Sequence, residues 1–485
     1  MSAGTIPSAP REPVRESLRI AGQKVWRDRV IEVHHPYSGA LVGTVPKASV
    51  DDVKRALTIA RSFRSPLTRH DRYTVLMKAG AIIASRRDDI ARLITLESGL
   101  CLKDSHYEVG RASDVLLFAA NQALIDDSKV FSCDLTAHGK NRKVYTMTEP
   151  LLGAISAITP FNHPLNQVIH KVAPGVATNN RVVLKPSEKT PLTAFVLADI
   201  LYEAGLPPEM LSVVTGDPAE IGDELVAGAD VDLVSFTGGV SAGKSIAAKA
   251  VYKRQVLELG GNDPLIVLED ADIEEAAALA ASGSYKNSGQ RCTAVKRMLV
   301  QDSVADRFVE ALLENTRAVK YGDPFDPAMD MGTVIDEPAA RRFEAVVNEA
   351  VADGARLLIG NVRHGALYSP TVLDRVTPNM RVVRQETFGP VSPVIRFKTV
   401  DQAIGIANGT AYGLSSSLCT NRIDLITRFV RELHVGSVNV REVPGYRLEI
   451  TPFGGIKDSG LGYKEGVLEA MKSFCNTKTY SLPWS

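Results

Sequence analysis

A single cysteine stands among cations in the segment SYKNSGQRCTAVKR, which covers residues 284–297. Arg291 comes directly before Cys292, and Lys296 and Arg297 follow it. Nearby positive charge favours the thiolate, which is the form of cysteine that acts as a nucleophile. The segment therefore predicts a reactive thiol at Cys292. The alternative is a small buried thiol that only fills space.

A carboxylate that could assist such a thiol is Glu258, which opens the sequence ELGGN 34 positions before Cys292. The two glycines that follow allow the backbone to approach a ligand closely. A carboxylate at this turn could act as a general base for water. The alternative is a solvent-exposed glutamate at the end of a strand.

An amide that could stabilise a developing anion is Asn162, which lies between two prolines in TPFNHP. The prolines hold this segment in a rigid, extended turn. The side-chain amide could then donate a hydrogen bond to an oxyanion. The alternative is an asparagine that serves only to form the turn.

The elements that must position these residues alternate between helix and strand. Short apolar strands that alternate with helices predict a parallel, doubly wound sheet. Such a sheet binds nucleotides outside the carboxyl ends of its strands. Helices are expected at 51–62, 70–98, 104–127, 164–178, 190–204 and 218–228, and strands at 151–159, 181–187, 211–216 and 231–239.

A second α/β unit follows, with strands expected at 263–270, 298–303, 355–360 and 392–397 and helices at 271–288 and 304–319. Two further segments, 143–150 and 473–485, have the character of edge strands. Exposed edges need cover, so pairing between subunits is expected. Residues 1–20 look like a loose, polar lead-in with no apolar signal core.

Composition limits the class of protein. The 485 residues include 56 Lys+Arg and 56 Asp+Glu, so the net charge is zero and nucleic-acid binding is not expected. Two or three domains are expected at this length. No window approaches 18 consecutive apolar residues, so no membrane span is expected. The five cysteines lie far apart, which indicates a reducing compartment, a cytoplasmic location and no metal site.

Together these pieces resemble the aldehyde dehydrogenase superfamily over nearly the whole chain. One short motif would be weak evidence, but seven in the family's order and spacing are very specific. They are TPFN (159–162), KPSEKTP (185–191), FTGG (236–239), ELGGN (258–262), GQRC (289–292), ETFGP (386–390) and PFGGIKDSGLG (452–462).

The resemblance implies a role for each candidate residue. Cys292 would attack the aldehyde to form a thiohemiacetal, whose oxygen is held by the Asn162 side chain and the Cys292 backbone N–H. Loss of hydride to the cofactor would leave a thioester, and Glu258 would activate the water that hydrolyses it. Relatives that transfer the acyl group to coenzyme A typically lack this glutamate, so hydrolysis is expected.

The resemblance also implies a cofactor, NAD, and the residues that bind it. The Glu188 carboxylate would accept hydrogen bonds from the ribose hydroxyls and repel the 2′-phosphate of NADP. Lys189 beside it complicates this preference. Glycine replaces the serine found in many relatives at 239, although backbone N–H groups at a helix N-terminus could still bind the pyrophosphate. The expected cofactor-binding residues are Lys185, Glu188, Gly239, Glu386 and Phe388.

The fold that the resemblance implies has three parts. A Rossmann-like, parallel-sheet NAD-binding domain is expected in two segments, 1–127 and 150–257. An α/β catalytic domain is expected at 258–455. A small β oligomerisation element is expected at 128–149 and 473–485, which implies a homodimer or homotetramer.

Four potential donors are expected around the substrate. Arg291 precedes the nucleophile, His163 follows the oxyanion asparagine, and Arg111 and Arg447 match tunnel positions of relatives. Burying four such groups is costly unless an anion meets them, and arginine suits carboxylate or phosphoryl oxygens. The alternative for Arg111 and Arg447 is an ordinary salt bridge. Arg441 in the same loop as Arg447 is a rival for its place.

This donor set is similar to that of non-phosphorylating glyceraldehyde-3-phosphate dehydrogenases. With an NAD-type site it resembles most closely the members that oxidise phosphonoacetaldehyde to phosphonoacetate in 2-aminoethylphosphonate degradation. A phosphonate, with up to two charges, would explain four donors. Another anionic aldehyde, such as glyceraldehyde 3-phosphate or succinic semialdehyde, stays open. So does a non-catalytic relative, although Cys292, Glu258 and Asn162 are all present.

Overall fold

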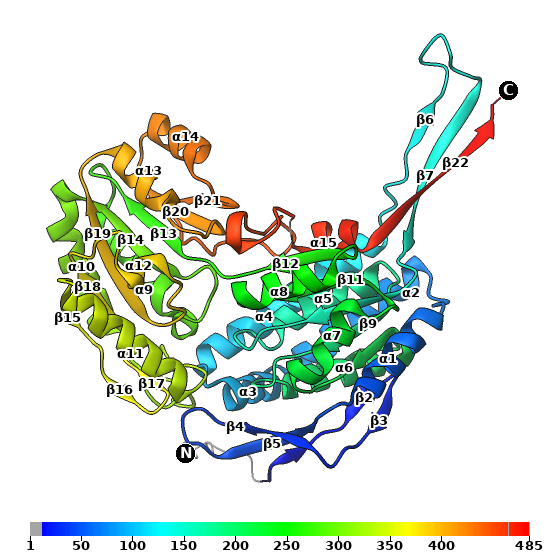
Figure 1. Cartoon of the computed structure of the whole chain (residues 1–485), viewed down its shortest axis with the longest axis horizontal. Helices are drawn as coiled ribbons and strands as arrows, with labels where there is room; N and C mark the ends of the chain where they lie inside the picture. Colours follow the sequence, from blue (N-terminus) through cyan, green and yellow to red (C-terminus); the bar gives the residue numbers. More distant parts are fainter. Residues whose placement is uncertain (1–11, 464, 485) are drawn as a thin grey trace.

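The computed structural model describes residues 12–463 and 465–484. Figure 1 shows two lobes side by side and a narrow arm that projects from one of them. Each lobe is built on a seven-stranded sheet, and the arm holds a sheet of three strands. The predicted fold class, α/β with a parallel-sheet cofactor domain, is confirmed.

The first sheet has the strand order β12-β11-β8-β9-β10-β2-β3. The five strands from β12 to β10 run parallel, and β2 and β3 join antiparallel at the edge. Their bounds are β2 Leu18–Ile20, β3 Gln23–Val25, β8 Ala154–Ile158, β9 Val182–Lys185, β10 Leu211–Val213, β11 Val231–Thr237 and β12 Arg254–Glu258.

Helices cover this sheet, and most of their positions follow the predicted periodicity. The stretch 70–98 is two helices rather than one, because the chain breaks at Arg86. Two buried glutamates accept hydrogen bonds from backbone N–H groups at the starts of later helices, which have no partner within their own helix. Glu97 accepts from Leu192 N, and Glu108 accepts from Leu165 N. The helices are α1 Val50–Ser62, α2 Arg69–Ser85, α3 Arg87–Ser98, α4 Leu102–Ala123, α5 Asn166–Ala177, α6 Leu192–Glu203, α7 Pro218–Ala227 and α8 Val240–Ala250.

The second lobe has the sheet order β15-β18-β19-β14-β13-β20-β21, parallel except for the β15–β18 pair. Its strands are β13 Asp263–Val267, β14 Val295–Gln301, β15 Arg356–Ile359, β18 Thr371–Asp374, β19 Val391–Phe397, β20 Ser415–Cys419 and β21 Ser437–Val440. Its helices are α9 Ile273–Tyr285, α10 Ala305–Ala318, α11 Glu337–Ala352, α12 Arg381–Arg384, α13 Val400–Asn408 and α14 Ile423–Glu432.

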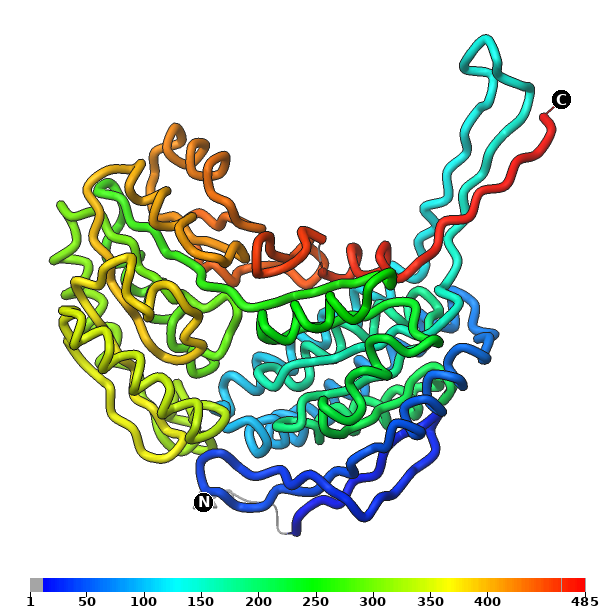
Figure 2. The backbone as a smooth tube through the Cα atoms, in the orientation of Figure 1, coloured from blue at the N-terminus to red at the C-terminus, as the bar shows by residue number. Residues whose placement is uncertain are grey.

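The arm consists of β6 (Val130–Ser132), β7 (Arg142–Pro150) and β22 (Cys475–Pro483). β22 pairs antiparallel with β7 along its whole length, and the tube in Figure 2 shows both extending away from the body. The predicted strand character of 143–150 is confirmed, and that of 473–485 is confirmed for 475–483, whereas Ser473 ends the helix α15 and residue 485 lies outside the described residues. Their pairing with another subunit, and the dimer or tetramer it implies, stay predictions.

Smaller elements complete the chain. β1 (Val14–Arg15), β4 (Val30–His34) and β5 (Leu41–Pro46) form a three-stranded sheet, β16 (Arg363–His364) pairs with β17 (Leu367–Tyr368), and α15 (Val467–Ser473) precedes the arm. Short 3₁₀ turns are η1 Pro208–Met210, η2 Lys286–Gly289, η3 Asp302–Val304 and η4 Lys457–Ser459.

The prediction of a loose lead-in is wrong for part of the N-terminal segment. Leu18 and Ile20 are fully buried in the strand β2. Residues 1–11 lie outside the described residues. None of the helices in the described ranges is long and apolar enough to cross a membrane.

The division into domains at 1–127 and 150–257, 258–455, and 128–149 with 473–485 stays a prediction. The sheets nevertheless bear on the site. β8 and β11 lead directly into residues 159–162 and the glycines 238–239, and β9 and β12 end at Lys185 and Glu258. Parallel strands bring these four ends to one edge of the sheet.

Candidate active site

Two cavities meet at the cysteine. The first, of about 500 Å³, is lined by all five residues expected to bind the cofactor: Lys185, Glu188, Gly239, Glu386 and Phe388. The second, of about 810 Å³, is lined by all four residues expected to bind the substrate: Arg111, His163, Arg291 and Arg447. Both linings share Asn162, Gln167 and Cys292. We call them the cofactor cavity and the substrate cavity.

The turn before Cys292 is tightly constrained. Asn287, Ser288 and Gly289 have φ values of 60°, 53° and 70°, a left-handed run that costs free energy and must be held by its surroundings. Asn287 N donates to Asp104 Oδ2 at 2.7 Å. A Cβ on Gly289 would lie 2.4 Å from the Gly389 backbone, so no other residue fits there without movement. The backbone turn that positions the Cys292 thiol is therefore rigid.

Asn162 is fixed to this turn. Its Nδ2 donates to Gln290 O at 2.8 Å, and its backbone oxygen accepts from Asn287 Nδ2 at 3.0 Å. One hydrogen of the Asn162 amide is used in this way, which leaves the second to donate elsewhere. The side chain is buried at the junction of the two cavities.

Burial controls the chemistry of the thiol. Desolvation raises the pKa of Cys292 to about 11, although Lys296 and Arg447 act in the opposite direction. Lys296 Nζ donates to the backbone oxygen of Cys292 at 2.6 Å. The thiol therefore rests protonated near neutral pH and needs a proton acceptor before it can attack.

The rate of alkylation of Cys292 by iodoacetamide is expected to rise with pH. Because its pKa is raised, the thiolate fraction should increase about tenfold per pH unit between about pH 7 and about pH 10. Mass spectrometry of the peptide that contains Cys292 would measure this rate. A plateau below pH 9 would contradict the raised pKa.

Glu258 is the last residue of β12, and its side chain is 4% exposed. Its backbone oxygen accepts from Gly238 N at 3.0 Å, which ties it to the FTGG segment. The next two residues, Leu259 and Gly260, line the cofactor cavity, but Glu258 belongs to neither lining. The structure thus places this carboxylate beside the cavity wall rather than in it, and its role as the base stays a prediction.

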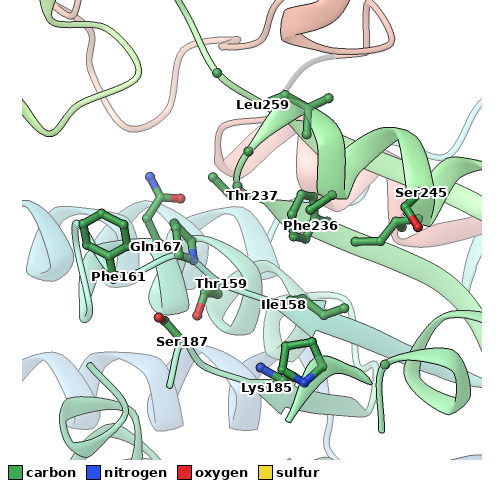
Figure 3. A pocket seen from close by; sticks show the side chains of 18 of the residues that line it. Ile158, Thr159, Phe161, Gln167, Lys185, Ser187, Phe236, Thr237, Ser245 and Leu259 are labelled. Carbon is green, nitrogen blue, oxygen red and sulfur yellow. The ribbon is translucent and has the colours of Figure 1, made fainter. Parts of the chain in front are cut away.

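An ion pair lies in the part of the cofactor cavity that was expected to hold the adenosine. Lys185 Nζ contacts Glu188 Oε1. Lys189, which the sequence left as a complication, does not line the cavity and pairs with Asp336 at 3.0 Å. Figure 3 shows Lys185 and Ser187 below Thr159 and Phe161, facing Phe236 and Thr237 across the cavity.

A second ion pair lies in the part of the cofactor cavity that was expected to hold the nicotinamide. Glu386 Oε1 lies 3.0 Å from Lys296 Nζ and accepts from Gly261 N at 3.1 Å. Phe388, at a φ of 57°, packs edge-on against Phe161 with 5.9 Å between ring centroids. A carboxylate and an aromatic ring therefore lie close to Cys292, in the same cavity.

The cavity fits a dinucleotide. Gly239 is the N-cap of α8, where free backbone N–H groups and the helix dipole favour a pyrophosphate. A Cβ added at Gly239 would meet nothing within 4 Å, so the space beside this helix end is open. Compared with a serine, the glycine at 239 lacks a hydroxyl group, but the space for a pyrophosphate stays open.

Two of the expected substrate arginines belong to a buried charge cluster. Arg111 Nε donates to Glu449 Oε1, and His170 Nε2 lies 2.6 Å from Glu449 Oε2. Arg447 lies 3.9 Å from the same carboxylate and 3.8 Å from the ring centroid of Phe453. Burial alone would raise the pKa of Glu449, but the hydrogen bond with His170 and the charges of Arg111 and Arg447 hold this pKa far below its usual range. Part of the cavity's positive charge is therefore already balanced.

The other donors are less fully paired. Arg291 Nη2 donates to Gly283 O at 2.7 Å, but its buried Nε has no hydrogen-bond partner among the described residues. The same holds for Arg447 Nη1. His163 Nδ1 lies 3.6 Å from Glu108 Oε2, beyond hydrogen-bond distance. Arg441 lies elsewhere, since it is exposed, bonds to Glu275 and does not line the cavity.

Sequence reasoning missed Gln167, Lys286 and Glu449, all of which line the substrate cavity. Glu449 gave no local signal, because its partner Arg111 lies 338 positions away. Lys286 did give one, since it stands six residues before Cys292 in the cation-rich segment. Gln167 follows Asn162 by five residues and is the second residue of α5.

Known proteins resemble this chain closely. The profile of the aldehyde dehydrogenase family matches residues 24–480. A 3-sulfolactaldehyde dehydrogenase of Priestia aryabhattai is 38% identical over 450 residues, 93% of this chain and 94% of that protein. The chain therefore belongs to the aldehyde dehydrogenase family, and it is an oxidoreductase of that class.

Two solved structures show the same architecture. The NADP-dependent glyceraldehyde-3-phosphate dehydrogenase of Bacillus halodurans, complexed with NADP, has a TM-score of 0.95 and 36% identity, and the match covers 97% of this chain and all of that one. An NAD-dependent aldehyde dehydrogenase of Sinorhizobium meliloti has a TM-score of 0.93 and 32% identity, with 98% and 96% covered. A nicotinamide dinucleotide cofactor agrees with both.

Proposed function

We propose that this chain oxidises phosphonoacetaldehyde to phosphonoacetate with NAD as the oxidant. The observation that carries the proposal is the shared wall of the two cavities. Cys292 and Asn162 stand at the junction, with a dinucleotide-shaped space on one side and a cation-rich space on the other. A short aldehyde placed there has its carbonyl at the thiol and its anion among the arginines.

The chemistry assigned to these residues is as follows. Cys292 releases its proton to water in the substrate cavity, and its Sγ attacks the carbonyl carbon. The oxyanion that forms accepts hydrogen bonds from Asn162 Nδ2 and from the Cys292 backbone N–H. A bound NAD, held by the residues that line the cofactor cavity, would supply the acceptor for the hydride that leaves that carbon. The product is a thioester on Cys292. Glu258 takes a proton from a water whose oxygen attacks the thioester, and the acid leaves as Cys292 regains its thiolate.

The positive charges that line the substrate cavity favour an anionic head group on the aldehyde. Arg291 and Arg447 line the substrate cavity together with Cys292, and the charge of Arg447 partly opposes the rise in the pKa of the thiol that burial causes. Phosphonoacetaldehyde has only two carbons, which keeps its phosphonate near these guanidinium groups. Buried donors without partners, such as Arg291 Nε and Arg447 Nη1 among the described residues, match tetrahedral oxygens.

The named relatives support an anionic aldehyde of this kind. One is named for 3-sulfolactaldehyde, whose sulfonate is also tetrahedral, and one for glyceraldehyde 3-phosphate. Glyceraldehyde 3-phosphate is therefore the second candidate substrate. Succinic semialdehyde remains an alternative, because a carboxylate also pairs with arginine.

A panel of aldehydes tests the substrate. NADH formation by the purified protein would be followed with phosphonoacetaldehyde, glyceraldehyde 3-phosphate, 3-sulfolactaldehyde, succinic semialdehyde and acetaldehyde. Phosphonoacetaldehyde is expected to have the highest kcat/KM, with acetaldehyde lower by about 10³-fold, the ratio for about 4 kcal/mol of anion recognition. A higher value for any other member of the panel would replace the proposed substrate.

NAD is proposed over NADP because the Glu188 carboxylate lines the adenosine end and Lys189 is held by Asp336 outside it. Replacing Glu188 by serine is expected to raise the NADP/NAD ratio of kcat/KM by about tenfold to a hundredfold. The change removes a repulsive charge and frees Lys185 to meet the 2′-phosphate. Glu203→Ser, at an exposed position that ends α6, is the control and should leave the ratio unchanged. An unchanged ratio in Glu188→Ser would show that another residue selects the cofactor.

A further inference from the structure

Lys286 is a basic side chain in the substrate cavity that the proposed mechanism does not use. It is the C-cap of α9 and begins the turn that leads to Cys292. Its side chain is half-buried, and Nζ lies 3.1 Å from the ring centroid of Tyr107 on α4. The aromatic face supports the ammonium group from one side and leaves its other side toward the cavity that both residues line.

The charge of Lys286 is not balanced by a direct contact. Within the described ranges, no carboxylate lies within ion-pair distance of its Nζ, whereas Arg111 is paired with Glu449. Asp104 acts on Lys286 electrostatically, but its Oδ2 already accepts from Asn287 N. A half-buried, uncompensated ammonium group is costly unless a ligand supplies the counter-charge.

The groups that act on Lys286 come from two elements. α4 contributes Lys103, Asp104, Tyr107 and Arg111, and the turn before the thiol contributes Arg291. Desolvation, helped by the two arginines and Lys103, lowers the pKa of Lys286 to about 8, although Asp104 opposes them. The charge of Lys286 therefore changes within the usual assay range.

We propose that Lys286 is a specificity-determining residue that contacts the anionic head group of the substrate and loses that contact when it is deprotonated. This inference rests on the proposed function, because it needs an anionic aldehyde in the substrate cavity. Binding and protonation are then coupled. The anion favours the protonated amine, so KM for an anionic aldehyde rises as the pH passes above about 8, and KM for a neutral aldehyde does not.

The test compares the wild type with Lys286→Met and Lys286→Arg on phosphonoacetaldehyde and acetaldehyde, from about pH 7 to about pH 9.5. At each pH the ratio of the two KM values is taken, so that titration of the thiol, which affects both aldehydes, cancels. Lys472→Met is the matched control, since Lys472 lies on α15, is 66% exposed and lines neither cavity.

At neutral pH, Lys286→Met is expected to raise KM for phosphonoacetaldehyde by about tenfold, with kcat changed less than about twofold and KM for acetaldehyde unchanged. The wild-type KM ratio should approach that of Lys286→Met above about pH 8. Lys286→Arg should keep the low KM throughout, because a guanidinium group stays charged. The ionisation of the phosphonate group is the same for every variant, so it cannot produce a difference in KM between the wild type and Lys286→Arg.

Three results would overturn the inference. One is a KM ratio in Lys286→Met equal to that of the wild type at neutral pH. Another is an alkaline rise in Lys286→Arg that follows the wild type, which would assign the titration to another group. The third is a wild type that oxidises acetaldehyde as well as phosphonoacetaldehyde, which defeats the proposed function itself. The first two leave the proposed function standing.

Discussion

Replacing Cys292 by alanine is expected to lower aldehyde oxidation by about 10⁴-fold or more. Without Sγ the carbonyl carbon cannot become tetrahedral on the protein, so hydride loss from an activated carbon and the thioester are both removed. NADH formation with phosphonoacetaldehyde measures the loss. Binding of NAD, followed by fluorescence titration, should change less than about threefold, because Cys292 only closes one end of a cavity that many other residues line.

Cys133→Ala is the control for this substitution. Cys133 lies in the arm between β6 and β7, is only partly buried and lines neither cavity, so its replacement should leave activity intact. If Cys292→Ala retained more than about a hundredth of the wild-type activity, another group would have to be the nucleophile.

Replacing Arg447 by glutamine is expected to lower kcat/KM for phosphonoacetaldehyde by about 10²- to 10³-fold. Its side chain is 12% exposed and stacks on Phe453, and its Nη1 has no hydrogen-bond partner in the described part of the chain. Loss of one partner from a buried charged contact costs about 2–5 kcal/mol. Acetaldehyde carries no anion, so its kcat/KM should change less than about threefold.

Arg441→Gln is the matched control, since Arg441 belongs to the same loop but is exposed and pairs with Glu275. It should leave both substrates unaffected. An equal loss for phosphonoacetaldehyde and acetaldehyde in Arg447→Gln would show that Arg447 supports the loop or the cluster around Glu449 rather than the head group.

Local patterns were sufficient to predict most helices and strands of the first lobe, whereas the cofactor residues and the positions of Arg111 and Arg447 came from the resemblance to the aldehyde dehydrogenase family. Strands such as 231–237 are rich in apolar and β-branched residues, are followed by glycines and alternate with periodic helices. The order of these elements along the chain could therefore be predicted. Residues at the ends of parallel strands were then expected at one edge of the sheet. The nine residues predicted to bind cofactor or substrate all line the expected cavity.

What could not be predicted depends on contacts between distant segments. The strand β2 is only three residues long and too short to show a period, yet its place at the edge of the first sheet buries it. No local pattern in the sequence indicates that Arg111 pairs with Glu449. This pairing makes the net positive charge of the substrate cavity smaller than the four donors alone implied. Nor could sequence show that Lys189 is held by Asp336, which simplifies the cofactor site.

The arm has a consequence for how the chain is made. β7 is synthesised early, but β22, the strand that pairs with it along its whole length, follows more than three hundred residues later. During that interval one edge of β7 has no partner within the chain, and unpaired edges promote association between growing chains. Ribosome-bound chains that stop before Cys475 should therefore aggregate more readily than complete ones. Slow translation of the second lobe would lengthen the time during which this edge of β7 is unpaired and the chain can aggregate.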